Sequence, residues 1–252
     1  MTEPIRSPAN EKLKLVRRLQ EGRGRARLGA FATEGEDLLD AGLEAGREPR
    51  FVLVRQSAAG PEVPVLALRT LPVADELLDK VSSLGSGTRV IAVWDLPPDE
   101  PIAEGPCVFL DGVADPGNVG AVVRSAAALC GARVVLGPGS ADPYAPKAVR
   151  AAMGAVHSHP PLPAPLAATP EPRLALAAHE GEPLDTEIER LRPATLVLGA
   201  EREGVSAEAL AACDGVATIP LHAGTESLNV AATAAIALHR ISSIAAGTDA
   251  SP

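Results

Sequence analysis

The sequence has very few aromatic side chains, and this scarcity limits how the protein can recognise a ligand. Only five of its 252 residues are aromatic: Phe31, Phe51, Trp94, Phe109 and Tyr144. Nucleic-acid modules that stack bases need several aromatic side chains on one surface, so a stacking platform for bases is excluded. Hydrophobic residues still make up 46% of the chain. The core must therefore be built from Ala, Val, Leu and Ile.

Cysteine and long apolar runs are also scarce. Cys107, Cys130 and Cys213 are widely spaced and form no C-x-x-C pair, so neither a disulfide framework nor a thiolate zinc site is indicated. The N-terminus lacks the apolar run of a signal peptide, and the longest run near the C-terminus, residues 230–238, is far below the ~20 residues that span a bilayer. We expect a cytoplasmic protein that does not contact membranes.

Positive charge is in deficit, since 23 basic residues face 32 acidic ones and the net charge is −9. An acidic chain is a poor bulk binder of nucleic acid. The average conceals one basic run, because residues 11–29 carry a local charge of +5 and the remainder −14. Its basic members are Lys12, Lys14, Arg17, Arg18, Arg23, Arg25 and Arg27. Such a run is either a solvated helix face or a strip that contacts phosphates.

Proline divides the chain into two parts. Pro97, Pro98, Pro101 and Pro106 crowd a stretch that can hold neither a helix nor a central strand. We therefore predict a small α/β domain at 1–97, a linker at 98–106 and a second domain at 107–252. In the first domain the apolar spacing predicts helices at 10–20, 37–43 and 74–81 and strands at 51–54 and 89–94.

The second domain alternates apolar strands with helices. Strands are predicted at 107–110, 133–136, 174–178, 195–198 and 216–219, and helices at 119–130, 146–153 and 228–244. A second proline cluster, 160–172, predicts a long surface loop. Near-continuous apolar strands separated by helices indicate an α/β fold with a parallel sheet covered on both faces. Ligands of such sheets bind beyond the carboxyl ends of the strands, so the loops there are the candidate site.

Three of those loops carry unusual residues. The first, 111–124, can cap a helix with Asn118 and places Arg124 nearly two turns later, although alone it is more typical of a capped turn whose arginine faces solvent. The second, 196–206, puts Glu201 directly after a strand, where a carboxylate is also favoured by the dipole of the next helix. The third, 219–230, leads into an Ala-rich helix that must pack closely against neighbours or another subunit.

Together the three loops resemble the ordered motifs of the SpoU/TrmH family of RNA ribose 2′-O-methyltransferases. The matching residues are Asp115-Pro-Gly-Asn118-x-Gly-Ala-x-x-Arg124, Leu198-Gly-x-Glu201-x-x-Gly204 and Ile219-Pro-x-x-x-x-x-x-Ser227-Leu-Asn-Val230. This likeness covers residues 107–245. More weakly, residues 27–35 resemble the start of an L30e-like α/β module that binds the RNA substrate in many members of the family.

The resemblance implies a trefoil knot in the C-terminal domain, with S-adenosylmethionine (SAM) held in the knot, and a homodimer with the active site at its interface. Carried over by motif, the cofactor-binding residues are Leu198, Gly199, Ile219, Leu221 and Leu228. The catalytic residues are Asn118, Arg124, Glu201, Ser227 and Asn229. The basic run at 11–29 then lies at the head of the RNA-binding domain, which favours phosphate contacts that do not read the bases.

The reaction requires a ribose hydroxyl to lose its proton, and a guanidinium cannot accept it because it stays protonated. Our hypothesis is that Arg124 holds a substrate phosphate and polarises the hydroxyl, while the proton leaves to phosphate or water. The chain departs from the family pattern at Arg202 and Ala223, where Gly is frequent, and at Ala152, where Ser is common.

The sequence thus predicts a SAM-dependent RNA 2′-O-methyltransferase acting on ribosomal RNA first and transfer RNA second. The alternative is a non-catalytic RNA-binding or assembly protein on a methyltransferase scaffold, and a small-molecule enzyme is a more distant rival. No metal is expected, because the pair His157 and His159 precedes prolines without a third ligand. The loop 137–142 contains a proline and lacks the third glycine of a dinucleotide fingerprint.

Overall fold

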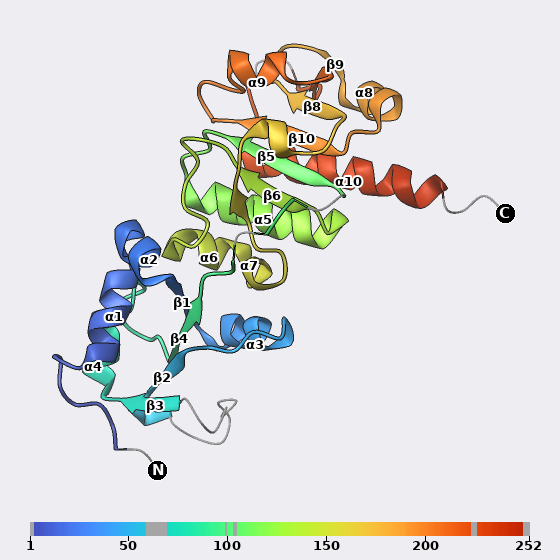
Figure 1. Cartoon of the computed structure of the whole chain (residues 1–252). Coiled ribbons are helices and arrows are strands. Elements are labelled where there is room, and N and C mark those ends of the chain that lie inside the picture. The colour runs from blue at the N-terminus through green and yellow to red at the C-terminus, as the bar shows by residue number, and fades with distance from the viewer. Residues whose placement is uncertain (1–2, 59–69, 99, 103–104, 223–225, 249–252) are drawn as a thin grey trace. The chain divides into compact units, whose positions relative to one another are not determined.

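The structure is a computed structural model of the chain and describes residues 3–58, 70–98, 100–102, 105–222 and 226–248. The chain folds into two compact units (Figure 1). The first unit comprises residues 1–98 together with 144–158, and the second comprises 99–143 together with 159–252. In the described part of the chain, no helix combines the length and apolar character that crossing a membrane requires.

The first unit is built on a mixed four-stranded sheet with the order β1-β4-β2-β3. Strand β4 pairs antiparallel with β1 and β2, and β2 pairs parallel with β3. The strands are β1 (Ala30–Glu34), β2 (Phe51–Arg55), β3 (Thr70–Val73) and β4 (Val90–Asp95). The helices before and between them are α1 (Glu11–Leu19), α2 (Gly22–Leu28), α3 (Glu36–Glu44) and α4 (Asp75–Val81).

Helix α1 shows how this unit is stabilised. Asn10 caps it by accepting a hydrogen bond from the backbone N–H of Lys12 at 2.9 Å. The apolar side chains at helical spacing, Leu13, Val16 and Leu19, are buried in the core that also contains Val81 and Ile91. The basic residues between them face outward, which is the amphipathic pattern of a helix covering one face of a core.

The second unit contains a seven-stranded sheet with the order β7-β6-β5-β10-β8-β11-β9. Every pairing in it is parallel. The strands are β5 (Cys107–Asp111), β6 (Arg133–Leu136), β7 (Leu162–Pro163), β8 (Arg173–Leu176), β9 (Glu182–Pro183), β10 (Thr195–Gly199) and β11 (Gly215–Thr218). Its helices are α5 (Pro116–Cys130), α8 (Leu184–Leu191), α9 (Ala207–Ala211) and α10 (Val230–Thr248). The predicted α/β fold with a parallel sheet is confirmed.

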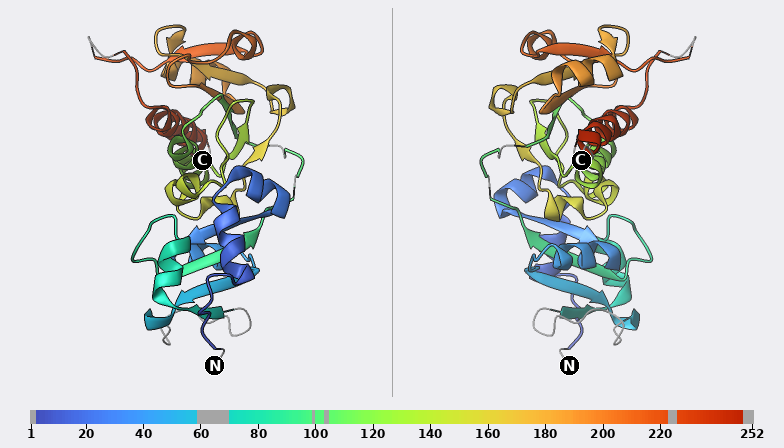
Figure 2. Two further views of the ribbon diagram at one scale, coloured as in Figure 1. Left: turned by 90° about the vertical axis from the view of Figure 1, so that its left-hand side faces the viewer. Right: turned by 90° about the vertical axis from the view of Figure 1, so that its right-hand side faces the viewer.

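The Ala-rich helix α10 packs alongside α5, as Figure 2 shows from two directions, and also contacts α8 and β10. Ala234, Ala237 and Leu238 are fully or almost fully buried by these contacts. Ile236 remains 40% exposed, so this chain alone does not bury all faces of the helix. The expectation of close packing therefore holds for one face of α10.

One segment departs from the predicted domain ranges. Residues 144–158, which include α6 (Pro146–Ala152) and α7 (Ala155–Ser158), pack within the first unit, so 107–252 is not one contiguous compact unit. The cause is a cluster of rings. Tyr144 lies 4.9 Å from Phe31, and His157 lies 4.6 Å from Trp94 and 5.4 Å from Phe31, measured between ring centroids.

The second proline cluster was predicted as a long surface loop, and this was incomplete. It contains strand β7 and a short 3-10 turn, η2 (Leu166–Ala168), and Thr169 in it is buried. Here the backbone of Leu162 and Pro163 pairs with β6 at the edge of the sheet, a position that tolerates proline.

Candidate active site

The carboxyl ends of three parallel strands lead into the three motif loops. Strand β5 ends at Asp111, which stands opposite Gly199 at the end of the neighbouring strand β10. Strand β11 ends at Thr218 and is separated from β10 by strand β8. Because parallel strands end at one edge of the sheet, the three loops meet there.

Side chains from all three loops are joined by hydrogen bonds. The side-chain amide of Asn118 donates to Glu201 Oε1 at 2.5 Å, and Asn229 Nδ2 donates to Asn118 Oδ1 at 3.0 Å. Asn229 Oδ1 in turn accepts from the backbone N–H groups of Ala231 and Ala232, at 2.9 and 3.4 Å. The structure therefore brings three of the five predicted catalytic residues into one Asn229–Asn118–Glu201 chain.

The ends of two helices hold this chain in place. Asp115 caps α5 by accepting from the backbone N–H of Asn118 at 2.9 Å, and Pro116 occupies the first turn, where its missing N–H is harmless. Asn229 caps α10 through its side-chain oxygen. Because that oxygen faces the backbone N–H groups, the Asn229 nitrogen faces Asn118, and an amide nitrogen can only donate. In this hydrogen-bonded series each amide therefore donates in the direction of the Glu201 carboxylate.

A cavity of about 630 Å³, here called the strand-end cavity, opens beside these loops. All five predicted cofactor residues line it: Leu198, Gly199, Ile219, Leu221 and Leu228. Glu201 and Ser227 of the predicted catalytic set line it as well. The geometry gathers the two predicted sets, while the roles of the individual residues remain predictions.

The sequence reasoning missed part of the cavity wall. Residues 176–180, at the end of strand β8 and just after it, line the cavity, as do Val205, Leu210 and Thr233. Strand β8 lies between β10 and β11, so its carboxyl end reaches the same edge of the sheet. The strand was predicted, but its place in the sheet was not.

Gly199 is required by the shape of the loop after β10. Ala200 and Gly204 exchange two backbone hydrogen bonds, of 3.1 and 2.9 Å, which fold the loop back on itself. A Cβ atom on Gly199 would lie 2.0 Å from the backbone carbon of Gly204, a distance that no packing permits. Gly204 itself has a φ of +70°, which favours glycine.

The remaining site residues lie apart from the hydrogen-bonded chain. Arg124 is exposed on α5 and forms no hydrogen bond or ion pair with the described residues. Ser227 is exposed and lines the cavity. Of the departures from the family pattern, Arg202 is exposed on the cavity wall, Ala152 is buried in α6 of the first unit, and Ala223 lies outside the described residues.

The basic run occupies α1 and α2 of the first unit. Six of its residues are exposed: Lys12, Lys14, Arg17, Arg18, Arg23 and Arg27. Lys12 Nζ lies 4.5 Å from the ring centroid of Phe51, and Lys14 pairs with Glu11 at 2.7 Å. We call the six exposed residues the basic strip.

Arg25 does not belong to the basic strip, so its predicted RNA contact is corrected. Its side chain is 4% exposed, and Nη1 donates to the carbonyls of Leu19 and Gln20 at 2.8 and 3.0 Å. These carbonyls at the end of α1 lack partners within the helix. Arg25 therefore stabilises the turn between α1 and α2 and is not available to a phosphate.

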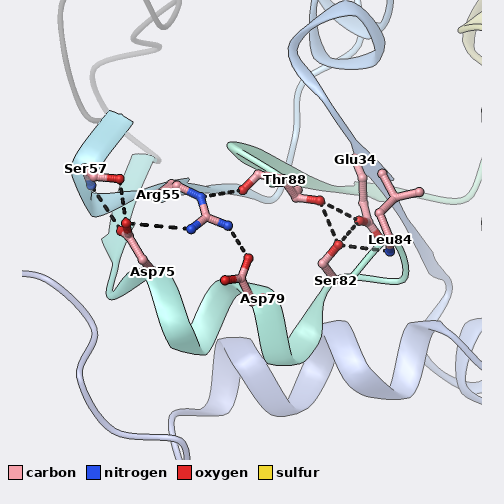
Figure 3. Close-up of polar contacts among 8 residues, drawn as sticks. All are labelled: Glu34, Arg55, Ser57, Asp75, Asp79, Ser82, Leu84 and Thr88. Carbon is pink, nitrogen blue, oxygen red and sulfur yellow. Dashed lines mark hydrogen bonds and ion pairs between the residues drawn. The ribbon is translucent and has the colours of Figure 1, made fainter. Parts of the chain in front are cut away.

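A polar network shapes the loop between α4 and β4 in the first unit (Figure 3). Glu34, at the end of β1, accepts from Ser82 Oγ at 2.5 Å and from the backbone N–H of Ser83 at 2.8 Å. Ser82 Oγ also lies 2.7 Å from Thr88 Oγ1. Glu34 thus has a structural role, because it ties β1 to this loop.

The same network continues around Arg55 (Figure 3). Its Nε donates to the carbonyl of Thr88 at 2.8 Å, and its guanidinium pairs with Asp79 and, at 3.7 Å, with Asp75. Hydrogen bonds from Ser57 to Asp75 lower the pKa of that carboxyl, with a smaller contribution from Arg55. These bonds join the end of β2 to helix α4 and to the loop that leads into β4.

His157 is a buried histidine in the first unit. Its side chain is 5% exposed among Trp94 and Phe31, and burial lowers its pKa to about 4. Its Nε2 finds no hydrogen-bond partner among the residues that the structure describes. Within the described ranges, no three His, Cys, Asp or Glu side chains are grouped as a metal site would require.

Comparison with known proteins extends over most of the chain. The model of the SpoU rRNA Methylase family matches residues 105–239. The 23S rRNA (guanosine(2553)-2′-O)-methyltransferase RlmP of Bacillus subtilis is 29% identical over 245 residues, which cover 94% of this chain and 98% of that protein.

Two solved structures have the same fold. A crystal structure of an RNA 2′-O ribose methyltransferase is 30% identical with a TM-score of 0.77, covering 95% of this chain and 98% of that one. The SpoU methyltransferase AviRb from Streptomyces viridochromogenes, solved in complex with AdoMet, has a TM-score of 0.83 over 94% of this chain and 98% of its own. At 24% identity, the second likeness concerns the fold alone.

Proposed function

Because this chain belongs to the SpoU rRNA methylase family, we propose that it is a SAM-dependent enzyme that methylates a ribose 2′-hydroxyl in ribosomal RNA. The observation that carries the proposal is the Asn229–Asn118–Glu201 chain, which joins three separate motifs beside the strand-end cavity. The relative from Bacillus subtilis supports ribosomal RNA as the substrate.

The strand-end cavity fits the cofactor in size and chemistry. Its volume of about 630 Å³ is within the range of small-molecule sites. Leu198, Ile219, Leu221 and Leu228 would form an apolar slot for an adenine, and Gly199 would let backbone groups approach it. When bound, SAM supplies a methyl group activated by a positively charged sulfur.

The protein's own contribution is mainly alignment of the hydroxyl with that methyl group, which can account for much of the rate enhancement. The Asn229–Asn118–Glu201 chain is preorganised, so the site does not have to reorder its polar groups during the reaction. Ser227, which lines the cavity, would orient a ribose or the cofactor.

Arg124 is the residue that we assign to the RNA phosphate. Its guanidinium is exposed and has no described partner, so it can bind two phosphate oxygens and polarise the hydroxyl next to them. Replacing Arg124 by Lys keeps the charge but removes the two-pronged geometry. We expect the kcat/KM for RNA to fall roughly tenfold or more, since charge-assisted hydrogen bonds contribute about 1.5–3 kcal/mol each. Near-full activity with an unchanged pH profile would contradict a bidentate role.

Several finer features belong to the same proposal. The C-terminal part forms a trefoil knot, the first unit is an L30e-like RNA-binding module, and the enzyme is a cytoplasmic homodimer that needs no metal. The partly exposed apolar face of α10, which includes Ile236, supports an interface there. The basic strip supports phosphate contacts by the first unit.

The proposal is tested by titrating the protein calorimetrically with SAM and by assaying transfer of a tritiated methyl group. Ribosomal and transfer RNA from a strain lacking the protein serve as parallel substrates. We expect binding, and incorporation into ribosomal RNA that blocks alkaline cleavage at one phosphodiester. Binding of RNA without SAM binding or incorporation would support the assembly-protein alternative, and incorporation into transfer RNA alone would correct the substrate.

A further inference from the structure

We propose that Asp111, which is outside the predicted catalytic set, is a positioning residue for the SAM site because its carboxylate holds one wall of the strand-end cavity. The wall in question is residues 199–206, here called the Glu201 loop. The inference rests on the proposed function, since it assigns Asp111 a role in forming the cofactor site.

The contact that carries the inference joins two distant parts of the sequence. Asp111 Oδ2 accepts a hydrogen bond from the backbone N–H of Ser206 at 2.7 Å, across 95 residues. The donor is the last residue of the Glu201 loop and the cap of helix α9, where Ser206 Oγ accepts from the N–H of Ala209 at 3.2 Å. A bond from an N–H to a carboxylate is charge-assisted and stronger than one between neutral groups.

Other bonds hold residues 200–204 of the loop. Ala200 and Gly204 pair through the backbone, and Glu201 is bound by Asn118. Asp111 acts at the other end, next to Val205, which is 8% exposed and lines the cavity. Without this bond the end of the loop loses its link to β5, and the wall formed by Val205 and its neighbours loses its fixed position.

Asp111 acts through the loop and not on the cofactor. It is half-buried, and it is not one of the described residues that line the strand-end cavity. Its loss should therefore weaken cofactor binding more than it slows the chemical step, because Asn118 still holds Glu201. A residue with a purely structural role would change the unfolding temperature and leave cofactor affinity unaltered.

The first experiment compares Asp111→Ala with Asp111→Asn, whose amide oxygen can still accept from Ser206. Calorimetry gives the Kd for SAM, steady-state assays on ribosomal RNA give KM and kcat, and thermal unfolding monitors folding. For Asp111→Ala we expect Kd and KM for SAM to rise roughly tenfold or more, with kcat at saturation within about threefold of wild type. For Asp111→Asn, which keeps an acceptor but loses its charge, Kd and KM should rise clearly less than for Asp111→Ala, with kcat again within about threefold of wild type.

The second experiment removes the same bond from the donor side. Ser206 has a φ of −63°, the value that proline fixes, so Ser206→Pro deletes the N–H without opposing the local backbone angle. Ser206→Ala is the matched control, because it loses the hydroxyl cap and keeps the N–H. We expect Ser206→Pro to weaken SAM binding as Asp111→Ala does, and Ser206→Ala to bind like wild type. The double variant Asp111→Ala/Ser206→Pro should be no weaker than either single variant.

Each outcome separates this inference from the proposed function. A wild-type protein that neither binds SAM nor methylates RNA refutes the proposed function. If the wild type does both, then an Asp111→Ala variant with normal affinity, or an Asp111→Asn variant as weak as Asp111→Ala, overturns the inference alone. Should Asp111→Ala fail to fold, equal affinities of Ser206→Pro and Ser206→Ala overturn it.

Discussion

Asn118 donates its side-chain amide to Glu201 at 2.5 Å, although 83 positions separate the two residues in the sequence. The bond connects the helix after β5 to the loop after β10, so it depends on these two strands lying next to each other in the sheet. It also fixes the direction of the amide, because a carboxylate can only accept while it is ionised. The following predictions concern this bond and the features around it.

Replacing Asn118 by Asp should place two carboxylates where an amide now meets one. Like charges this close raise the pKa of the pair, and a shared proton restores a hydrogen bond between them. We expect Asn118→Asp to lower kcat roughly tenfold to a hundredfold at pH 8, and the ratio of variant to wild-type activity to rise as the pH falls toward 6. Initial-rate assays across this pH range measure the effect. Asn118→Ala is the control, and its ratio to wild type should not depend on pH; parallel pH profiles for both variants would contradict the interpretation.

A methyl group on Gly199 should disrupt the loop beside the strand-end cavity. Its Cβ would lie 2.0 Å from the backbone of Gly204, so the loop must shift. We expect Gly199→Ala to abolish measurable SAM binding and to lower the free energy of unfolding in urea by roughly 3 kcal/mol or more. Gly204→Ala is the matched comparison, because nothing lies within 4 Å of its Cβ and only its φ of +70° opposes the change, at about 1–2 kcal/mol. Equal effects of the two substitutions would disprove the steric argument.

Charge reversal in the basic strip should weaken RNA binding in a salt-dependent way. Each lost phosphate contact removes up to about one unit from the slope of log K against log salt, so Arg17, Arg18 and Arg23 changed together to Glu should reduce it by up to about 3. Filter binding at several salt concentrations measures the slope, and SAM affinity should be unchanged. Arg25→Ala separates charge from structure: it should lower stability by roughly 1–3 kcal/mol and leave the slope as in wild type. An unaltered slope in the triple variant would rule out phosphate contacts by the strip.

Burial of His157 should make stability depend on pH. Its pKa is lowered from 6.5 to about 4, so the folded state resists protonation while the unfolded state accepts a proton below pH 6.5. The stability from neutral His157 is complete above pH 6.5 and is lost as the pH falls from 6.5 toward 4, by on the order of 3 kcal/mol. Urea unfolding at several pH values measures this loss. His157→Phe, which cannot be protonated, should remove this part of the pH dependence, and an identical pH dependence in that variant would refute the assignment.

The parts of the fold that could be predicted are those in which one residue type forms a regular pattern. The apolar runs at 107–110 and 195–198 became the adjacent central strands β5 and β10, because only such runs can be buried on both faces of a sheet. The candidate site followed from the loops after these strands. Its residues could be named because the three motifs resemble a known family, and Asp111 was left out because its role depends on a contact with Ser206 that spacing does not reveal.

Other elements depend on contacts that the local sequence does not reveal. Helix α2 holds two glycines, poor helix formers, and forms because Arg25 binds the end of α1 and Gly24 lies against the carbonyl of Arg18. Strand β3 contains Pro72, which argues against a strand unless it lies at the edge of the sheet, as it does. Residues 144–158 had a predictable helix, but its partners Phe31 and Trp94 could not be inferred from spacing.

The ring cluster around His157 has a consequence for how the protein can be divided. Because residues 144–158 fold with the first unit, the chain crosses between the two units three times. A fragment ending at Pro98 would leave Phe31 and Trp94, each only 1% exposed in the whole chain, without the side chains of Tyr144 and His157 that cover them. To produce the first unit alone, residues 144–158 must therefore be joined to residues 1–98. A chimera with a related protein made at a single junction in 98–106 would carry the first unit without its residues 144–158.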